Sequence, residues 1–245
     1  MSEKTVLGIE DVFWKDRMDR TSGKGDVIIW GVLRGQKALT LDMWRSWLLG
    51  PDQNGEFRQV RITSLHRQRV PSATLLPGQA GSLIVECIHE NESFQRSQVW
   101  KGMAIIEDDG ELVKASYGFT AEVFIMAHPS AMKPGKHEYM AHSFSMRAVV
   151  RVDSVIPAHD VNLNADEPEE EKVGELPRKT RGLVHFRFLM GPEWVTIDER
   201  VLITDSSGAR VVGKVVKLDE WRLPGDDVES GQTDETLEQT ALLKL

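Results

Sequence analysis

Short stretches in which apolar and polar residues alternate recur along the chain, and they limit its possible folds more than any other feature. Residues 57–65 (FRQVRITSL) and 119–126 (FTAEVFIM) alternate with a period of two between turn-forming residues, which predicts half-buried β-strands. No long amphipathic helix pattern separates them. A chain of many short strands must protect its sheet edges, so we expect an all-β protein with closed barrels. Further strands are predicted at 26–33, 81–88, 146–152, 183–189 and 209–218.

The 245 residues suit two small barrels in tandem better than one large domain. The polar run ENESFQRSQ (90–98) interrupts the apolar pattern before WKGMAII resumes it, so we predict a first barrel at 1–97 and a second at 98–218. The linker is expected within 96–118. An acidic loop is predicted at 158–180 in the second barrel, and a mobile acidic tail at 219–245.

The acidic residues are concentrated in two segments. Residues 158–177 and 219–245 each carry a net charge of −6, so removing both from the formal net charge of −8 leaves about +4 for the rest of the chain. A mildly basic folded part permits contact with nucleic acid without requiring it.

Membrane, disulfide and metal-centred classes are disfavoured by composition. No apolar run approaches the roughly 20 residues that cross a bilayer, and the N-terminus does not look like a targeting signal, so a cytoplasmic protein is expected. Cys87 is the single cysteine, which excludes an intrachain disulfide, and its apolar surroundings predict a buried, inert thiol. The seven histidines form no metal-ligand spacing, so no metal site is expected.

Motifs for nucleotide chemistry are also missing. No GxxxxGK[ST] loop occurs, and SGKGD (22–26) lacks both the upstream glycine and the Ser/Thr that would bind magnesium. DSSG (205–208) fits a DxxG pattern, but a hairpin turn is the better interpretation. There is no GxSxG elbow. We therefore expect no catalytic residues, no cofactor and no GTP binding by this chain.

Basic residues are concentrated between residues 58 and 69, and this basic strip is the best candidate in the sequence for binding an anionic partner. No acidic residue interrupts it. Because side chains alternate across a strand, Arg61 and His66 should lie on opposite faces, and part of the strip should lie in the turn HRQRVP (66–71). A charged strand edge that prevents aggregation and a phosphate-binding surface both remain possible. The strip contains Arg58, Arg61, His66, Arg67 and Arg69.

Several motifs resemble a known family. IEDVF (9–13), GKGDVIIWGVLRG (23–35) and LLGPD (48–52) resemble the opening of domain two of elongation factor Tu and related translational GTPases. ITSLHRQRVP (62–71), followed by PGQAGSLIV and WKGMAI (100–105), is similar to the GTP-binding protein 1 and 2 branch. The likeness continues through domain three and spans about residues 5–218. The long connection at 14–22 and the acidic insert depart from the family pattern.

The resemblance implies two tandem barrels of the domain two and domain three type, without the GTPase domain that carries the nucleotide ligands in full-length relatives. It also implies contact with tRNA or ribosomal RNA, and with a GTPase domain in cis or in trans. Lys101 matches a basic family position near the tRNA end. Arg67 and Arg69 are weaker candidates, and His66 and Arg61 join them through the basic strip.

Three functions remain open from the sequence. A non-catalytic RNA-binding module of an elongation-factor-like protein is favoured. A protein-interaction scaffold that no longer binds RNA is the alternative, with the acidic segments recruiting basic partners. An unrecognised hydrolase comes third.

Overall fold

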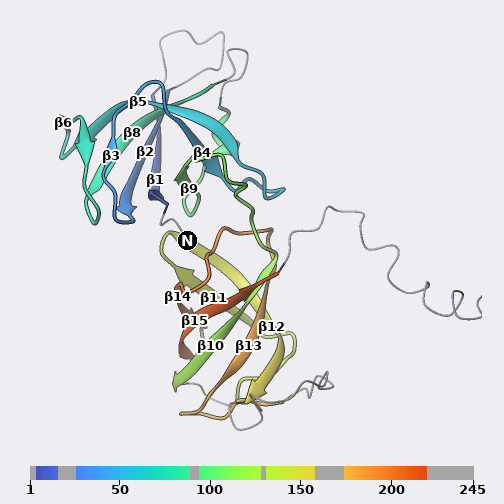
Figure 1. Ribbon diagram of the computed structural model, residues 1–245. Coiled ribbons are helices and arrows are strands. Elements are labelled where there is room, and N and C mark those ends of the chain that lie inside the picture. The colour runs from blue at the N-terminus through green and yellow to red at the C-terminus, as the bar shows by residue number, and fades with distance from the viewer. Residues whose placement is uncertain (1–3, 16–25, 89–93, 128–130, 158–173, 220–245) are drawn as a thin grey trace, which may run out of the picture.

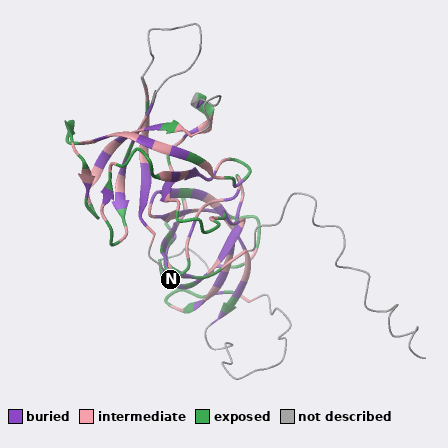
Figure 2. Ribbon diagram, turned by 45° about the horizontal axis from the view of Figure 1, so that its top comes forward, coloured by how far each residue is buried: buried purple, intermediate pink, exposed green. Residues whose placement is uncertain are grey.

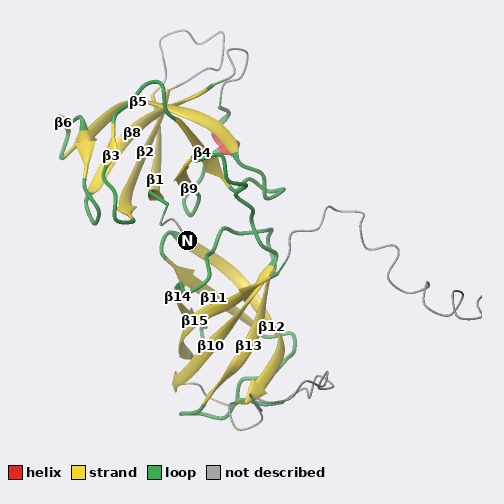
Figure 3. Cartoon of the chain, in the orientation of Figure 1, coloured by secondary structure: helices red, strands yellow, loops and turns green. Residues whose placement is uncertain are grey.

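The alternating segments fold as predicted into two antiparallel barrels, which the computed structural model describes over residues 4–15, 26–88, 94–127, 131–157 and 174–219 (Figure 1). Almost every regular element is a strand, and a single turn of 3₁₀ helix at Arg96–Gln98 (η1) is the exception within the described residues (Figure 3). The predicted fold class is confirmed.

The first barrel closes through its end strands. Its sheet order is β4-β9-β1-β2-β8-β5-β6, and pairing between β4 and β5 closes the strands from β4 to β5 into a ring, with the short β6 paired to β5 beyond it. The short strands β3 and β7 pair separately. The strands are β1 (Val6–Lys15), β2 (Asp26–Arg34), β3 (Leu39–Thr40), β4 (Ser46–Gly50), β5 (Arg58–Arg67), β6 (Val70–Pro71), β7 (Thr74–Leu75), β8 (Ala80–Cys87) and β9 (Ala104–Glu107).

The second barrel is a ring of six strands in the order β10-β13-β12-β11-β14-β15, closed by pairing between β10 and β15. In both barrels the inward side chains are buried and alternate with more exposed outward ones (Figure 2). The strands are β10 (Gly118–Ala127), β11 (Glu138–Ser143), β12 (Met146–Pro157), β13 (Arg181–Phe188), β14 (Arg200–Thr204) and β15 (Arg210–Leu218).

A glycine permits a close main-chain approach in the first barrel. A β-bulge shifts the register of β1 against β2 between Ile9 and Asp11, opposite Gly31 and Trp30. A Cβ atom on Gly31 would stand 2.1 Å from the carbonyl oxygen of Gly8. Only a residue without a side chain fits there, as expected where a bulge bends a strand into a barrel.

The boundary between the barrels differs from the one expected after residue 97. Strand β9 pairs with both β1 and β4, and Met103 and Ile105 belong to the core of the first barrel. The apolar run that resumes at Trp100 is therefore the last strand of the first barrel, and residues 108–117 connect the two. Most of the predicted acidic loop and tail, at 158–173 and 220–245, lies outside the described residues.

Cys87 is half-buried rather than fully buried, and it packs against the first core. It lies at the last position of β8, where the strand leaves the barrel wall. The prediction of full burial was therefore wrong.

The barrels meet at an apolar seam. Val6, Ala104 and Ile106 of the first barrel form a buried cluster with Phe144 and Trp194 of the second. A Cβ atom on Gly8 would lie 2.6 Å from the Phe144 ring, which shows how closely this ring approaches β1.

An ion pair flanks the seam. Arg34 Nη1 lies 2.6 Å from Glu199 Oε1, and the guanidinium sits 5.3 Å from the centroid of the Phe144 ring. The Glu199 side chain is 3% exposed, and its other oxygen accepts hydrogen bonds from the main chain and hydroxyl of Thr196. A carboxylate this buried depends on its partners, because an unpaired buried charge is costly.

Arg34→Met should destabilise the chain by about 2 kcal/mol, because it leaves the Glu199 carboxylate buried without its cation. The measurement is chemical denaturation followed by tryptophan fluorescence. Lys37→Met, at an exposed position nearby, should change stability by less than about 0.5 kcal/mol. Equal stability of the two variants would show that the ion pair contributes nothing to the seam.

Candidate nucleic-acid interface

Two aromatic side chains stand out on the outer face of the first barrel. Phe13 on β1 is 51% exposed and Trp30 on β2 is 40% exposed. The β1–β2 register places Phe13 opposite Ile28 and Trp30 opposite Asp11, so both rings lie on the same side of adjacent strands. Ile28 on β2 pairs with Ile84 on β8, and both are half-buried on the same face. Together with Phe13 and Trp30 they form an apolar surface, called here the aromatic platform.

His66 lies in the same row as Trp30. Trp30 pairs with Ser82 on β8, and Ser82 pairs with His66 on β5. Since adjacent strands are about 4.8 Å apart, His66 stands roughly 10 Å from Trp30 across the outer face. The Ser64 hydroxyl lies 3.3 Å from His66 Nδ1 and orients the ring.

Arg61 also lies on this outer face, contrary to the expectation that it and His66 face opposite ways. A bulge between Ile62 and Ser64 inserts one residue into β5 against β8, so the buried positions are Val60, Ile62 and Leu65. The extra residue reverses the alternation and returns both basic side chains to one side. Arg61 nevertheless stands apart, because it faces Glu86, which lies four residues along β8 from Ser82.

Arg67 and Arg69 lie at the β5–β6 hairpin. Gln68 and Arg69 form its two-residue turn, with φ values of 51° and 67°. Turns of this kind favour Asn-Gly, because both central residues adopt the left-handed conformation. Arg69 is exposed, and Arg67 Nη1 contacts Gln79 Oε1 at 3.4 Å. The hairpin therefore presents two arginines beside the row that contains His66.

Lys101 lies at the opposite side of the platform. It is in the turn before β9, where Gly102 N donates to Ile9 O, and its Nζ is 3.1 Å from Asp11 Oδ1. The hydrogen bond from Lys101 lowers the pKa of Asp11 below its usual value. Because the Lys101 side chain is 67% exposed, this surface pair is weak and leaves the ammonium within reach of another anion.

The structure thus places His66 on the outer face at one side of the aromatic platform and Lys101 at the other. Arg67 and Arg69 lie at the adjoining hairpin, where alternation along β5 points the Arg67 side chain away from that of His66. Phe13 and Trp30 were not predicted as exposed residues from the sequence. Trp30 lies in the continuous apolar run VIIWGV. In a strand that is apolar on both faces, the sequence does not show which positions point outward.

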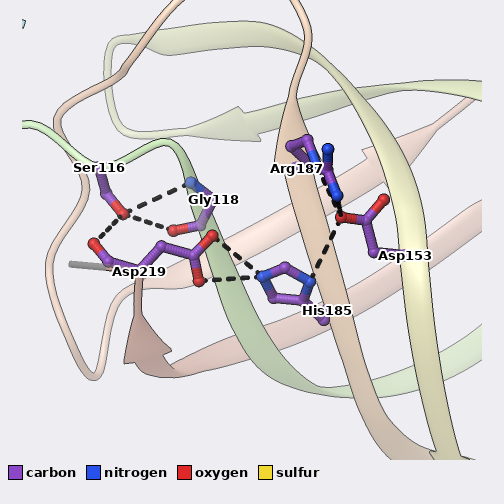
Figure 4. A network of polar contacts seen from close by, with 6 residues as sticks. All are labelled: Ser116, Gly118, Asp153, His185, Arg187 and Asp219. Carbon is purple, nitrogen blue, oxygen red and sulfur yellow. Dashed lines mark hydrogen bonds and ion pairs between the residues drawn. The ribbon is translucent and has the colours of Figure 1, made fainter. Parts of the chain in front are cut away.

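A serine, a histidine and two aspartates approach one another in the second barrel without forming a nucleophilic site. His185 Nε2 lies 2.9 Å from Asp219, and its Nδ1 lies 3.7 Å from Asp153 (Figure 4). The Ser116 hydroxyl contacts the main-chain carbonyls of Gly118 and Asp219 instead of the imidazole. The network ties the end of β15 to the barrel wall.

DSSG acts as a hairpin turn between β14 and β15, as predicted. The Asp205 carboxylate accepts hydrogen bonds from the Ser207 hydroxyl and the Ala209 N–H, both at 2.7 Å, and lies 2.6 Å from His137 Nε2. Burial alone would raise the pKa of Asp205, but these hydrogen bonds outweigh it and lower the pKa to about 2. The Asp205 carboxylate therefore stabilises the hairpin turn.

Among the described residues, no group of three or more His, Cys, Asp or Glu side chains is placed to hold a metal ion. Within the same part of the chain, no helix has the length and apolar character to span a membrane.

Known proteins resemble this chain in sequence and in fold. No protein-family model matches it. The chain is 29% identical over 196 residues to GTP-binding protein 1 of Xenopus laevis, which covers 80% of this chain and 26% of that protein. It is 23% identical over 158 residues to GTP-binding protein 2 of Homo sapiens and Mus musculus, covering 64% of this chain and 22% of each relative. The chain therefore spans about a quarter of these curated relatives.

A solved structure of Sup35 in complex with GDP superposes with a TM-score of 0.63 at 13% identity, covering 89% of this chain and 48% of that one. At this identity the match establishes the fold. Together these comparisons confirm the resemblance to GTP-binding proteins 1 and 2.

Arg69→Gly should stabilise the chain by up to about 1 kcal/mol, because glycine adopts positive φ without steric cost. Chemical denaturation of the variant measures the change. Gly78 also has positive φ, at +80°, so Gly78→Ala should have the opposite effect. A destabilised Arg69→Gly variant would contradict a strained turn.

Asp205→Asn should lower stability at neutral pH and weaken the loss of stability on acidification. A carboxyl group with a pKa of about 2 when folded and about 3.9 when unfolded stabilises the fold above pH 4, and this contribution disappears as the pH falls from about 4 to 2. Thermal unfolding across this range measures it. Ser206→Ala, in the same exposed turn, serves as the control. Parallel pH profiles for Asp205→Asn and the unmodified chain would exclude this role.

Proposed function

We propose, from this chain's relation to GTP-binding proteins with a translation-factor fold, that it is a non-catalytic module that binds tRNA or ribosomal RNA through the outer face of its first barrel. The supporting observation is the aromatic platform of Phe13 and Trp30 between Lys101 on one side and His66 on the other, with Arg67 and Arg69 at the adjoining hairpin. Exposed aromatic rings among basic side chains suit single-stranded RNA, whose bases stack while its phosphates pair with cations.

Stacking and charge make separate contributions to such binding. A base stacked on an aromatic side chain contributes about 1–3 kcal/mol. Each phosphate contact makes the affinity depend on salt, because binding releases condensed counterions. The end of a tRNA is single-stranded and offers both kinds of contact. In this proposal the chain acts in the cytoplasm, and a GTPase domain in cis or in trans supplies nucleotide hydrolysis.

The alternative function is a protein-interaction scaffold that no longer binds RNA. Two carboxylates on the same face favour it. Asp11 contacts Lys101, and Glu86 lies directly opposite Arg61, so part of the positive charge is already neutralised. The RNA-binding experiment distinguishes the two functions.

Trp30→Ala should weaken binding of fluorescein-labelled tRNA about tenfold at low salt through the loss of stacking. Arg67→Glu and Lys101→Glu should also weaken binding, and each should lower the salt dependence by about one phosphate contact. Fluorescence anisotropy at several salt concentrations measures both quantities.

Lys136→Glu, at an exposed position of the second barrel, is the matched charge control. If Arg67→Glu and Lys101→Glu leave binding of tRNA and ribosomes unchanged at low salt, these residues are not the contact sites. If the unmodified chain binds neither ligand, the RNA-binding function is excluded and the scaffold remains.

A further inference from the structure

A second row of exposed side chains crosses the outer face of the second barrel. Strand register aligns Phe124 on β10 with Val212 on β15, Val212 with Leu202 on β14, and Leu202 with His142 on β11. Phe124, Val212 and Leu202 are 36%, 38% and 39% exposed. Because aligned neighbours on adjacent strands are about 5 Å apart, the three apolar side chains form one continuous stripe.

This stripe forms the floor of an open hollow of about 680 Å³. Arg181, Arg200 and Lys214 line it, and Glu122 is the one carboxylate among the described residues of the lining. Arg181 extends the row, because it pairs with Phe124 from β13. Burial and the nearby Arg147 lower the pKa of His142, so the imidazole adds little positive charge at neutral pH. Lys214 contacts the exposed Asp198 at 2.6 Å.

The composition of the hollow selects between kinds of partner. Beside the stripe, the lining includes the half-buried Phe144 ring and the His142 imidazole. Of the three stripe side chains only Phe124 offers a ring on which a nucleobase stacks, because the aliphatic Val212 and Leu202 offer no stacking surface. Arginine forms two-point hydrogen bonds with carboxylates, and here two arginines flank the apolar floor. A peptide with apolar side chains between carboxylates matches the hollow in two ways. Its apolar side chains cover the apolar floor, and its carboxylates pair with the flanking arginines.

We propose that the Phe124–Val212–Leu202 stripe is a docking site for an acidic segment of a partner protein, whose apolar side chains cover the stripe while its carboxylates pair with Arg181, Arg200 and Lys214. This site lies on a different barrel from the platform around Trp30. Because the two surfaces share no residue, a substitution in one should leave binding at the other unchanged.

The test measures binding of a fluorescein-labelled synthetic peptide in which glutamate alternates with leucine. The full chain should bind it in fluorescence anisotropy, more tightly than the matched peptide with lysine in place of glutamate. The double variant Arg200→Glu/Leu202→Glu should weaken binding of the acidic peptide about tenfold or more, because it removes one cation and adds two carboxylates to the hollow.

The control double variant Lys136→Glu/Val216→Glu makes the same change in net charge at exposed positions outside the hollow, and it should bind the peptide as the unmodified chain does. Thermal melting of both variants checks that they fold. Arg67→Glu should leave peptide binding unchanged, so failure of this proposal can be told apart from failure of RNA binding.

Several outcomes would overturn the docking site. The chain could fail to bind the acidic peptide, or it could bind both peptides equally. The two double variants could lose binding to the same extent. Loss of tRNA binding by Arg200→Glu/Leu202→Glu with peptide binding intact would assign the stripe to RNA. A change in sedimentation of this variant with peptide binding intact would assign the stripe to self-association.

Discussion

Closure of each sheet into a ring is the constraint on which the rest of this structure depends. Pairing of β4 with β5 and of β10 with β15 leaves one face of every strand inside a barrel and the other outside. Main-chain hydrogen bonds then satisfy the strand edges, and the inward side chains form two separate cores. The outward side chains do not pack in either core, so aromatic and basic residues at these positions can be exposed to solvent.

The seam turns two independent barrels into one unit. Phe144 reaches across to β1, and its approach requires glycine at position 8. Beside it, Arg34 neutralises the buried carboxylate of Glu199. The hydroxyl of Ser145 points to the carbonyl oxygens of Gly102 and Met103, next to the turn that carries Lys101. The seam and the candidate RNA-binding face are thus joined through a few residues of main chain.

The two outer faces differ in the apolar groups that they expose. The first barrel exposes two rings near His66, two arginines and Lys101, whereas the second exposes one ring and two aliphatic side chains among arginines. Both faces combine apolar area with positive charge.

The amino-acid pattern was enough to predict the longer strands β2, β5, β8, β10, β12, β13 and β15, but not β1, β4, β9, β11 or β14. The given sequence also lacks the GxxxxGK[ST] motif. A period of two identifies strands such as β5 and β10 because alternation is a local property of extended chains. It also placed Arg67 and Arg69 at a turn. It could not show that β9 belongs to the first barrel, since strand pairing joins residues about 100 positions apart. Tertiary structure was needed to show which apolar residues remain outside. Trp30 and the buried Ile29 are neighbours in one apolar run and point to opposite faces of β2, and closure of the barrel set which of the two faces became the core.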